Sequence, residues 1–507
     1  MTNDGSAAAP WSTLEEIVAA GLIESMENWP LPFDPQNPAR RLKQAGAPVV
    51  AGDTLLLYNG LHGKLFLQNY NNNDYITILA VDGHRPILES VHLQACRFWR
   101  LQGLGVSGEP YGRYNNGRLL FLESHNFQGP SARIDVIECD VYSSEQPWTT
   151  AAEWLDKVSS GIYITADSVN AVNNDIRNVD MGLQAIGDYI NAVGNRVVNF
   201  SGDGMRPLGS HVLFESNVIK NCYDVDDNHD DGIQSFRVNN YTPDDVVIRG
   251  NIIINNEDAN QPLAGPLQGI GCFDGFFNNW LVENNLILVN HWHGITFLGA
   301  RNCRVVNNTV LDPTPAVRPG PSWIMVANHK DGRPSEGCEV INNVVNTLDV
   351  DGMLINNVTL GTIDDYNRNF VSPANFDFHL LPDSELIDKA DDEESSATDL
   401  DGKPRPQGGR ADIGCYEFTS STTDVVGEPT TAGLAMYPNP ASTSIVIFDL
   451  ADNASLELLD ASGRVLQRMQ LSGVVREVDL RRLASGVYYV KAVGKDGGLR
   501  VGRFVKQ

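Results

Sequence analysis

Three patterns in the sequence predict an all-β protein, in which a right-handed parallel β-helix precedes a small C-terminal β-sandwich. An apolar-x-x-Asn-x-apolar pattern recurs through the middle of the chain. A glycine followed by a large apolar residue opens a series of short strands. Residues 434–507 alternate between apolar and polar positions, with turn residues between the runs, as strands of a sandwich do.

The asparagine pattern marks one turn in each coil. Successive asparagines are 21 to 35 residues apart, which describes a short coil with loops inserted into the longer turns. We expect asparagine here because it tolerates the left-handed backbone conformation, and its stacked amides then bond along a ladder. The asparagines are Asn174, Asn195, Asn217, Asn251, Asn285, Asn308 and Asn343.

The glycine pattern gives the register of one strand per coil. Each strand is short, apolar at alternate positions and bounded by Gly, Asn or Asp, which is typical of strands. Stacked at about 4.8 Å, such strands build a solenoid. The glycines are Gly161, Gly182, Gly204, Gly232, Gly269, Gly294 and Gly352.

The regions on either side of the repeats complete the domain plan. In residues 1–45, Thr13 and Glu16 have the spacing of a capping box, so we expect a short helix that caps the solenoid. Residues 46–418 form the predicted β-helix, 419–433 a Thr/Ser/Gly linker, and 434–507 the sandwich. "AGDTLLLYNG" resembles the opening coils of β-helix polysaccharide lyases, and "RADIGCYEF" their closing segment.

The C-terminal region, with "MYPNPAS" and "LASGVYYVKAV", resembles the type IX secretion sorting domain. The resemblance implies that the type IX secretion machinery is a partner and that the protein is secreted or held at the cell surface. The first residues, "MTNDGSAAAP", have no basic region followed by an apolar one. We therefore expect a signal peptide that has been removed or lies before a misplaced start.

Composition excludes several classes of partner. The formal charge is -27, which argues against nucleic acid because phosphates need a basic surface. No run approaches the roughly 20 apolar residues of a membrane helix. The seven cysteines are scattered without a CxxC motif, so we interpret them as buried core residues, with a Cys303–Cys338 disulfide as the alternative. We expect a monomer and no organic cofactor.

Candidate site residues fall into columns when the strands are aligned by their glycines. Stacked coils bring neighbours in a column to about 5 Å of each other. We predict catalytic roles for His229, His293, Asp231, Asp203 and Arg206, and substrate binding by Gln234, Gln268, Trp292, Arg301 and Lys330. Tyr163 and Trp323 are further candidates for stacking against sugar rings.

The acidic loop that holds His229 has two interpretations. It is either a solvated loop that binds Ca²⁺ through Asp224, Asp226 and Asp227, or the setting of a histidine acid or base. His291 and His293 supply two zinc ligands at most, so zinc is the weaker interpretation.

Two family resemblances bear on the reaction. "DNHD" (227–230) resembles the D-P-H-D motif of alginate C5-epimerases, which implies proton abstraction by Asp227 and His229, with Asn228 in place of proline. "GDG", "DDGI" and "HWHGITFLG" resemble the strands of polygalacturonases, which are inverting hydrolases, although an extra coil intervenes and R-I-K is absent.

The residue types favour β-elimination of a uronate-containing polysaccharide. That reaction needs a group that neutralises the carboxylate and a base that removes the C5 proton. Three alternatives remain: an inverting hydrolase using Asp203 and Asp231, a C5-epimerase, and a non-catalytic glycan-binding β-helix.

Overall fold

The computed structural model describes residues 4–419 except 115 and 259, together with the strands and some turns of 436–506. The chain divides into two compact units, Met1–Thr419 and Ser420–Gln507. The predicted linker 419–433 lies outside the described residues after Thr419.

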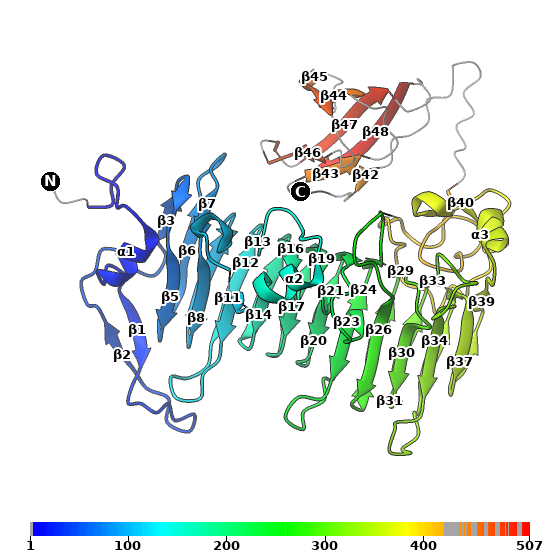
Figure 1. Ribbon diagram of the computed structural model, residues 1–507, viewed down its shortest axis with the longest axis horizontal. Helices are drawn as coiled ribbons and strands as arrows, with labels where there is room; N and C mark the ends of the chain where they lie inside the picture. The colour runs from blue at the N-terminus through cyan, green and yellow to red at the C-terminus, as the bar shows by residue number, and fades with distance from the viewer. Residues whose placement is uncertain are drawn as a thin grey trace. The chain divides into compact units, whose positions relative to one another are not determined.

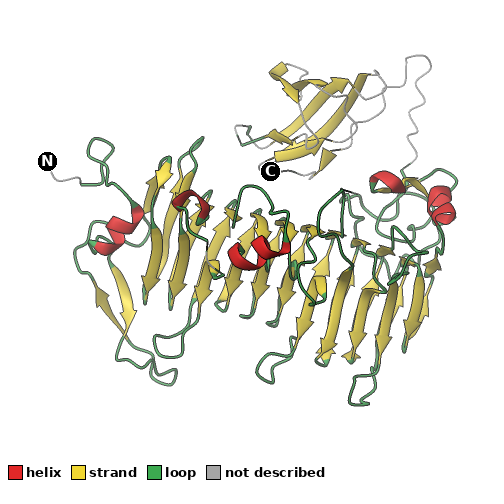
Figure 2. Cartoon of the chain, in the orientation of Figure 1, coloured by secondary structure: helices red, strands yellow, loops and turns green. Residues whose placement is uncertain are grey.

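The first unit is a parallel β-helix with three long sheets (Figures 1 and 2). Each complete coil contributes one strand to each sheet, and strands of consecutive coils pair in parallel. Sheet 1 carries the candidate site. Its strands are β5 (Lys64–Gln68), β8 (Ser90–Gln94), β11 (Arg118–Glu123), β14 (Ser160–Ile164), β17 (Leu183–Ala185), β20 (Met205–Pro207), β23 (Asp230–Phe236), β26 (Leu267–Asp274), β30 (His293–Leu298), β34 (Trp323–Ala327) and β37 (Thr347–Val350).

Sheet 2 follows sheet 1 in each coil, and an antiparallel pair, β1 and β2, extends its N-terminal edge. Its strands are β1 (Ser25–Asn28), β2 (Arg40–Lys43), β3 (Thr54–Leu57), β6 (Asn71–Ala80), β9 (Arg97–Gln102), β12 (Ala132–Ile137), β15 (Asp167–Val172), β18 (Ile190–Val193), β21 (Leu213–Glu215), β24 (Val247–Arg249), β28 (Leu281–Glu283), β32 (Arg304–Val306), β35 (Glu339–Ile341) and β38 (Met353–Ile355).

Sheet 3 closes each coil before the chain returns to sheet 1. Its strands are β4 (Gly60–Leu61), β7 (Pro86–Leu88), β10 (Gly105–Val106), β13 (Asp140–Tyr142), β16 (Asp175–Val179), β19 (Arg196–Phe200), β22 (Val218–Cys222), β25 (Ile252–Ile254), β29 (Leu286–Leu288), β33 (Thr309–Leu311), β36 (Val344–Val345) and β39 (Val358–Thr359). Short pieces outside the three sheets are β27 (Phe277–Asn278), β31 (Ala300–Arg301), β40 (Phe370–Ser372), β41 (Asp377–Leu380) and the 3-10 turns η1 (Glu109–Tyr111) and η2 (Pro373–Asn375).

The asparagine ladder is present inside the turns between sheets 2 and 3. The Asn195 side-chain oxygen accepts from both the backbone and the side-chain amide of Asn174, at 3.0 and 2.8 Å. Asn195 repeats both bonds to Asn217 in the next coil. The left-handed conformation, however, belongs to the residue before each ladder position, such as Asn173 and Gly194. The expectation that the ladder asparagine is itself left-handed was wrong, because that asparagine is selected for its buried amide.

The glycine column lies at the corner where sheet 3 turns into sheet 1. A Cβ atom on Gly204 would lie 2.4 Å from a methyl group of Ile219 in sheet 3, and one on Gly269 would lie 2.1 Å from the Gly294 carbonyl oxygen. Only glycine fits this corner, which explains why the pattern sets the register of sheet 1.

A short helix covers the apolar N-terminal end of the coil stack. Helix α1 (Leu14–Ala19) is capped by Thr13, whose side chain accepts from the Glu16 backbone amide. Its Leu14 and Ile17 join the central core and close the N-terminal end, as predicted. Among the described residues, the Glu16 side chain makes no return bond to Thr13, so the predicted capping box is half formed. Helix α3 (Ile363–Asn369) has both bonds of a capping box.

Residues 360–418 fall within the predicted β-helix, 46–418, but they follow β39, the last strand of its three sheets. They pack against the outward face of sheet 3, where Leu286 and Leu288 belong to a second core together with Tyr366 and Phe378. Ile287, which lies between the two leucines, belongs to the central core. β29 is apolar on both faces, so its outward face must be covered. Residues 360–418 provide that cover. Helix α2 (Ala151–Lys157) covers a smaller cluster around Trp154.

The second unit contains two small antiparallel sheets around their own core, which includes Leu456, Val490 and Phe504. Its strands are β42 (Met436–Tyr437), β43 (Ser444–Ile447), β44 (Ala454–Asp460), β45 (Val465–Leu471), β46 (Glu477–Asp479), β47 (Gly486–Val493) and β48 (Leu499–Lys506). This agrees with the predicted all-β fold class.

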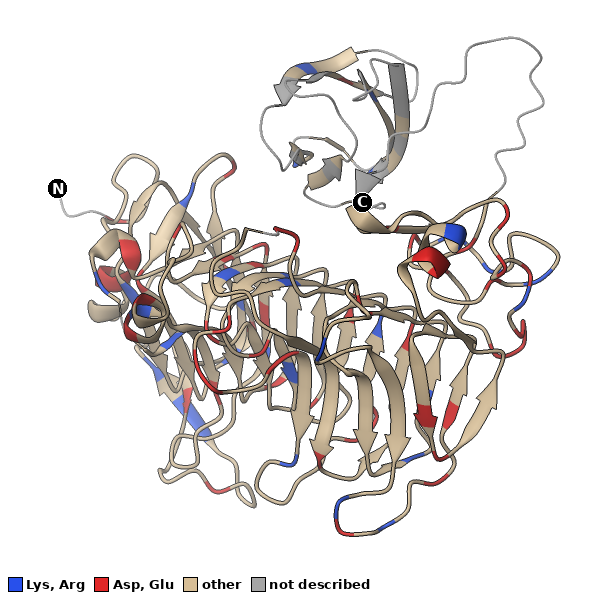
Figure 3. Ribbon diagram, turned by 45° about the vertical axis from the view of Figure 1, so that its right-hand side comes forward, with Lys and Arg blue, Asp and Glu red and all other residues tan. Residues whose placement is uncertain are grey.

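All seven cysteines are buried and free, including Cys303 and Cys338, so the alternative disulfide is not formed. Among the helices of the described residues, none has the length and apolar character to cross a bilayer. Acidic side chains occur mainly along loops and turns of the first unit (Figure 3).

Candidate functional site

A single row of side chains crosses the outward face of sheet 1. Strand pairing places Tyr163 beside Gln184, Gln184 beside Arg206, and Thr296 beside Gly271. Gln234 pairs with Gly271 on its other side. The glycine alignment places Arg206, Gln234 and Thr296 in one column, and the strand pairing agrees. The row runs through the polar cluster described next.

Asp203 and Arg206 form the first part of the cluster on β20. The Arg206 Nε donates to Asp203 Oδ2 at 2.5 Å, and the other carboxylate oxygen accepts from the Asp231 backbone amide at 2.9 Å. The Asp203 side chain has no exposed surface, whereas 16% of the Arg206 side chain is exposed. Asp203 thus holds the guanidinium at the surface and is itself out of reach of a ligand.

Asp231 plays the same part for His229 on the next coil. Its Oδ2 lies 3.1 Å from His229 Nδ1 and accepts from Gln234 Nε2 at 2.9 Å. The Asp231 side chain is fully buried, while 59% of the His229 side chain is exposed. An ionised carboxylate only accepts, so when Asp231 is ionised the His229 proton lies on Nδ1 and the exposed Nε2 of the neutral ring keeps its lone pair.

The remaining oxygen of Asp231 has no hydrogen-bond partner among the described residues, and neither has the side-chain oxygen of Gln268 on the paired strand. A Cβ atom on Gly271 would lie 2.3 Å from that Asp231 oxygen and 2.5 Å from the Phe273 ring. Gly271 therefore leaves the space that the carboxylate and the ring occupy. Buried oxygens without partners in a structure are uncommon and need a reason.

His293 is held differently from His229. Its Nδ1 lies 3.0 Å from the Thr296 hydroxyl oxygen, which also accepts from the Trp323 indole nitrogen at 2.9 Å. Thr296 is buried. Within the described residues, His293 Nδ1 is the one acceptor that lies within reach of the Thr296 hydroxyl proton. If that proton is used, as buried donors generally are, neutral His293 carries its own proton on Nε2.

The pKa values separate the two histidines. The hydrogen bond to Asp231 raises the pKa of His229, whereas burial lowers the pKa of His293 to about 4. Burial also raises the pKa of Asp203 and of Asp231, against the opposing effects of Arg206 and His229. At neutral pH, His293 is therefore an uncharged hydrogen-bond donor, and His229 is the histidine that takes up a proton more readily.

Aromatic rings line the C-terminal side of the cluster. The Phe273 ring lies 6.3 Å from the His229 ring and 4.9 Å from the His293 ring, measured between centroids. The Trp292 and Trp323 rings stack at 6.2 Å, with Trp323 at 5.0 Å from His293. The predicted Trp292 is thus brought into the site.

A hollow of about 700 Å³ begins at Arg206 and extends toward the N-terminal coils. It is open along one side and passes over the same row of side chains. Its lining includes His92, Arg118, Phe121, Tyr163, Asp180 and Gln184. The polar cluster therefore lies at one end of a groove long enough for more than a single ring.

Two predicted binding residues lie outside this cluster. Lys330 pairs with Asp274 at the C-terminal end of β26, at 2.7 Å. Arg301 lies on β31, after the end of β30, where it faces Phe276 and Glu336. Both follow the ends of their strands, whereas the histidines lie at the starts, so the structure does not join Arg301 and Lys330 to the site.

Calcium binding by the acidic loop stays a prediction. Within the described part of the chain, no three His, Cys, Asp or Glu side chains are placed to hold a metal ion, and this includes Asp224, Asp226 and Asp227. Asp226 instead accepts from the Asn228 backbone amide at 2.8 Å. The same finding applies to zinc at His291 and His293, whose rings stack at 5.2 Å.

Sequence reasoning missed Phe273 and the arginine–aromatic part of the groove. Phe273 follows Gly271 by two positions. To predict that its ring lies in the space that Gly271 leaves free, one must know that Gly271 is on the outward face of the strand. Arg118 and Phe121 lie on β11, where Leu119 pairs with the position that holds glycine in later coils. Without that glycine, the strand could not be aligned from the sequence.

The chain was compared with family models, curated proteins and solved structures. The model described as right handed beta helix region matches residues 160–313, and the model described as secretion system C-terminal sorting domain matches residues 435–507. The predicted right-handed β-helix and the C-terminal sorting domain are thereby confirmed. Curated proteins gave no match.

Three solved structures illustrate the likeness. Pectate lyase Pel9A is 14% identical over 82% of this chain and 93% of its own, with a TM-score of 0.40. A rhamnogalacturonan lyase is 15% identical over 73% and 88%, with a TM-score of 0.41. The mannuronan C-5 epimerase AlgE6 A-module of Azotobacter vinelandii is 14% identical over 62% and 90%, with a TM-score of 0.37.

Proposed function

We propose that this protein is an exported polysaccharide lyase that cleaves a uronate-containing chain by β-elimination. The observation that carries the proposal is the exposed His229 that the buried Asp231 orients, one coil after Arg206, where a groove of about 700 Å³ ends. The sorting domain at residues 435–507 supports export through the type IX machinery.

The proposed reaction assigns one task to each group. The Arg206 guanidinium, with amide donors from Gln234 and Gln268, neutralises the uronate carboxylate and so acidifies the C5 proton. His229 Nε2 removes that proton. His293 Nε2 donates a hydrogen bond to the glycosidic oxygen as the C4–O bond breaks and the C4=C5 double bond forms. The departing oxygen takes its proton from water, and the hydroxide that remains takes up the proton held by His229.

Inverting hydrolysis is the less well supported alternative. It requires two carboxyl groups that face the scissile bond, one of them protonated, with a water between. The Asp203 and Asp231 side chains have no exposed surface and are engaged by Arg206, His229 and Gln234. Asp230 is buried beside the Cys222 thiol, which donates to it at 3.2 Å.

A substrate panel tests the proposal directly. The protein is incubated with pectate, alginate, rhamnogalacturonan, glycosaminoglycans and a neutral glucan, and ultraviolet absorbance of the unsaturated uronate is followed together with reducing ends. Absorbance that rises with reducing ends supports elimination. Reducing ends without absorbance would indicate hydrolysis, C5 exchange with deuterated solvent without cleavage would indicate an epimerase, and binding alone would indicate a glycan-binding protein.

His211 provides a matched control for His229. It is also an exposed histidine beside an aspartate, with its Nδ1 3.5 Å from Asp245, and it stacks on Tyr189 outside the lining of the groove. The proposal expects His229→Gln to lose turnover and His211→Gln to keep it. Equal turnover in both variants would remove His229 from the mechanism.

A further inference from the structure

The part of the groove farthest from the histidines has its own chemistry. The Arg118 guanidinium lies 3.8 Å from the centroid of the Tyr163 ring and 4.4 Å from that of Phe121. The Phe121 ring in turn stacks on His92 at 4.8 Å. These residues occupy β8, β11 and β14, and all of them line the hollow that ends at Arg206. We call them the arginine–aromatic shelf: His92, Arg118, Phe121 and Tyr163.

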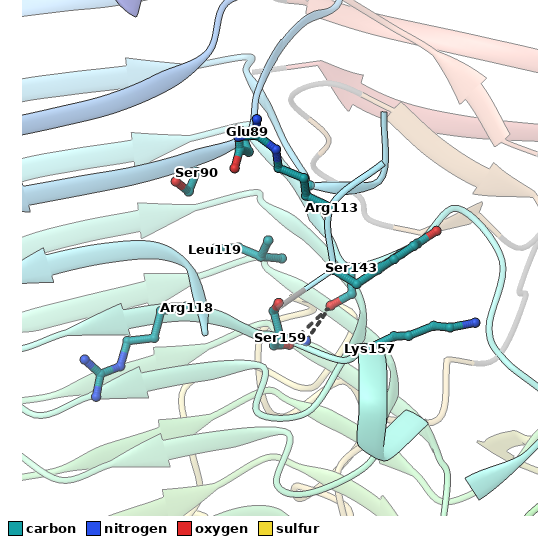
Figure 4. A pocket seen from close by; sticks show the side chains of 10 residues that line it. Glu89, Ser90, Arg113, Arg118, Leu119, Ser143, Lys157 and Ser159 are labelled. Atoms are coloured by element: carbon teal, nitrogen blue, oxygen red, sulfur yellow. Dashed lines mark hydrogen bonds and ion pairs between the residues drawn. The ribbon is translucent and has the colours of Figure 1, made fainter. Parts of the chain in front are cut away.

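Arg118 differs from the other cations nearby. Arg113 is paired with Glu89 at 2.7 Å, and Lys157 with Glu153 at 3.2 Å. Arg118 is exposed and has no ion pair within the residues that the structure describes. Figure 4 shows its side chain directed away from the Ser143–Ser159 contact and from the side chains of Arg113 and Lys157.

The small pocket between these cations is not the binding site. It encloses about 10 Å³, which is room for roughly one water molecule. The open hollow on the other side of Arg118 is therefore the space that a sugar chain can enter.

From these contacts we infer that the arginine–aromatic shelf binds a uronate ring of the substrate at a distance from the reacting bond. The inference rests on the proposed function and adds the direction of the chain. An aromatic face packs against the apolar face of a sugar ring, and the Arg118 guanidinium binds the ring carboxylate through paired hydrogen bonds. The polysaccharide then lies across the strands, from the shelf to Arg206.

The spacing along the groove sets the length of ligand required. The shelf lies two to four strands from β20, with Arg118 three strands away, which corresponds to about 10–19 Å for the shelf and about 14 Å for Arg118. A disaccharide bound at the histidines does not reach Arg118, whereas a pentasaccharide does. Arg118, which is exposed and has no ion pair among the described residues, also supplies local positive charge that a polyanion needs on a protein with a formal charge of -27.

The test measures binding separately from turnover. Affinities are determined by calorimetry in a His229→Gln background, with galacturonate and alginate di- and pentasaccharides and a neutral glucan pentasaccharide. Arg118→Gln removes the charge, Arg118→Lys keeps it without the planar group, and Arg113→Gln is the matched control. Unfolding temperatures confirm that each variant is folded.

The inference expects Arg118→Gln to weaken a uronate pentasaccharide by at least about tenfold, and Arg118→Lys to weaken it by less. Disaccharide affinity and the Arg113→Gln variant should stay unchanged. Pentasaccharide affinity unchanged by Arg118→Gln would overturn the shelf and leave the proposed reaction intact. If none of the uronate oligosaccharides binds, both fall, and if they bind through Arg118 but are never cleaved by the unmodified protein, the reaction alone falls.

Discussion

Two sets of polar side chains run along this solenoid, and they differ in whether their hydrogen bonds are complete. In the asparagine ladder, each amide bonds to the next coil, so that Asn251 donates to Phe214 and Asn285 and accepts from Asn217. In the site on sheet 1, one oxygen of Asp231 and the side-chain oxygen of Gln268 have no partner among the described residues. The ladder is complete within itself, whereas the site keeps buried oxygens without partners.

The same contrast separates two histidines that both face carboxylates. His379 is bound on both ring nitrogens, by Asp377 at 2.6 Å and Asp401 at 3.0 Å. His229 is bound through Nδ1 by Asp231, and its Nε2 has no recorded partner within the described residues. A histidine with both nitrogens occupied stabilises the fold, whereas one with a single nitrogen occupied is oriented for proton transfer.

The sharpest way to break this contrast is to remove the open histidine. His229→Gln should lower kcat by about 10²- to 10⁴-fold, the usual contribution of a general base, while the unfolding temperature changes little because 59% of the side chain is exposed. Steady-state kinetics on the best substrate of the panel, beside His211→Gln, measure the effect. If His229→Gln loses its fold together with its activity, His229 stabilises the structure, as His379 does, and the contrast between the two histidines fails.

The ladder makes the opposite prediction. Asn251→Ala removes bonds to two neighbouring coils and leaves buried groups unpaired, which should cost at least about 2 kcal/mol of unfolding free energy. The kcat per folded molecule should stay unchanged. Chemical denaturation measures the cost.

Asn191→Ala is the control for the ladder, because Asn191 also bonds to an asparagine, Asn170, at 2.9 Å but is exposed. The expected cost there is a few tenths of a kcal/mol. Similar costs at Asn191 and Asn251 would show that closure of the buried ladder contributes nothing particular to stability.

Thr296 tests how far the site depends on a partner that the sequence barely signals. Thr296→Val keeps the shape but removes the hydroxyl between His293 Nδ1 and the Trp323 indole. We expect kcat to fall by about tenfold, or about 1.4 kcal/mol, with KM unchanged. Nitrogen NMR of the imidazole should show His293 losing its single tautomer; a kcat equal to that of the unmodified protein would contradict the assigned proton.

The contrast also explains what the sequence could and could not predict. Asn195 and Gly204 recur because one coil repeats the steric and hydrogen-bonding needs of the next, so pattern alone predicts the fold and the columns of sheet 1. Asp231 was found because it shares a column with Asp203, and His229 because it stands among carboxylates in the acidic loop two residues before Asp231. Arg301 and Lys330 were misplaced because a loop at the far end of a strand has no repeat to align it. Arg118 was missed for the same reason, since its strand lacks the glycine.

The smallest expected effect concerns His379, the histidine whose two ring nitrogens are both bound by carboxylates. Its two carboxylates raise the pKa of His379 to about 9 from an ordinary value of 6.5. Stability from this group is therefore present in full below about pH 6.5 and is lost as the pH rises through 9. Because 37% of the side chain is exposed, solvent screening reduces the contribution to on the order of 1 kcal/mol. The unfolding temperature of His379→Gln should lie below that of the unmodified protein at about pH 6 and approach it at about pH 10. A difference that does not change with pH would mean that His379 contributes through packing against Tyr416 and that its charge has no part in closing this end of the fold.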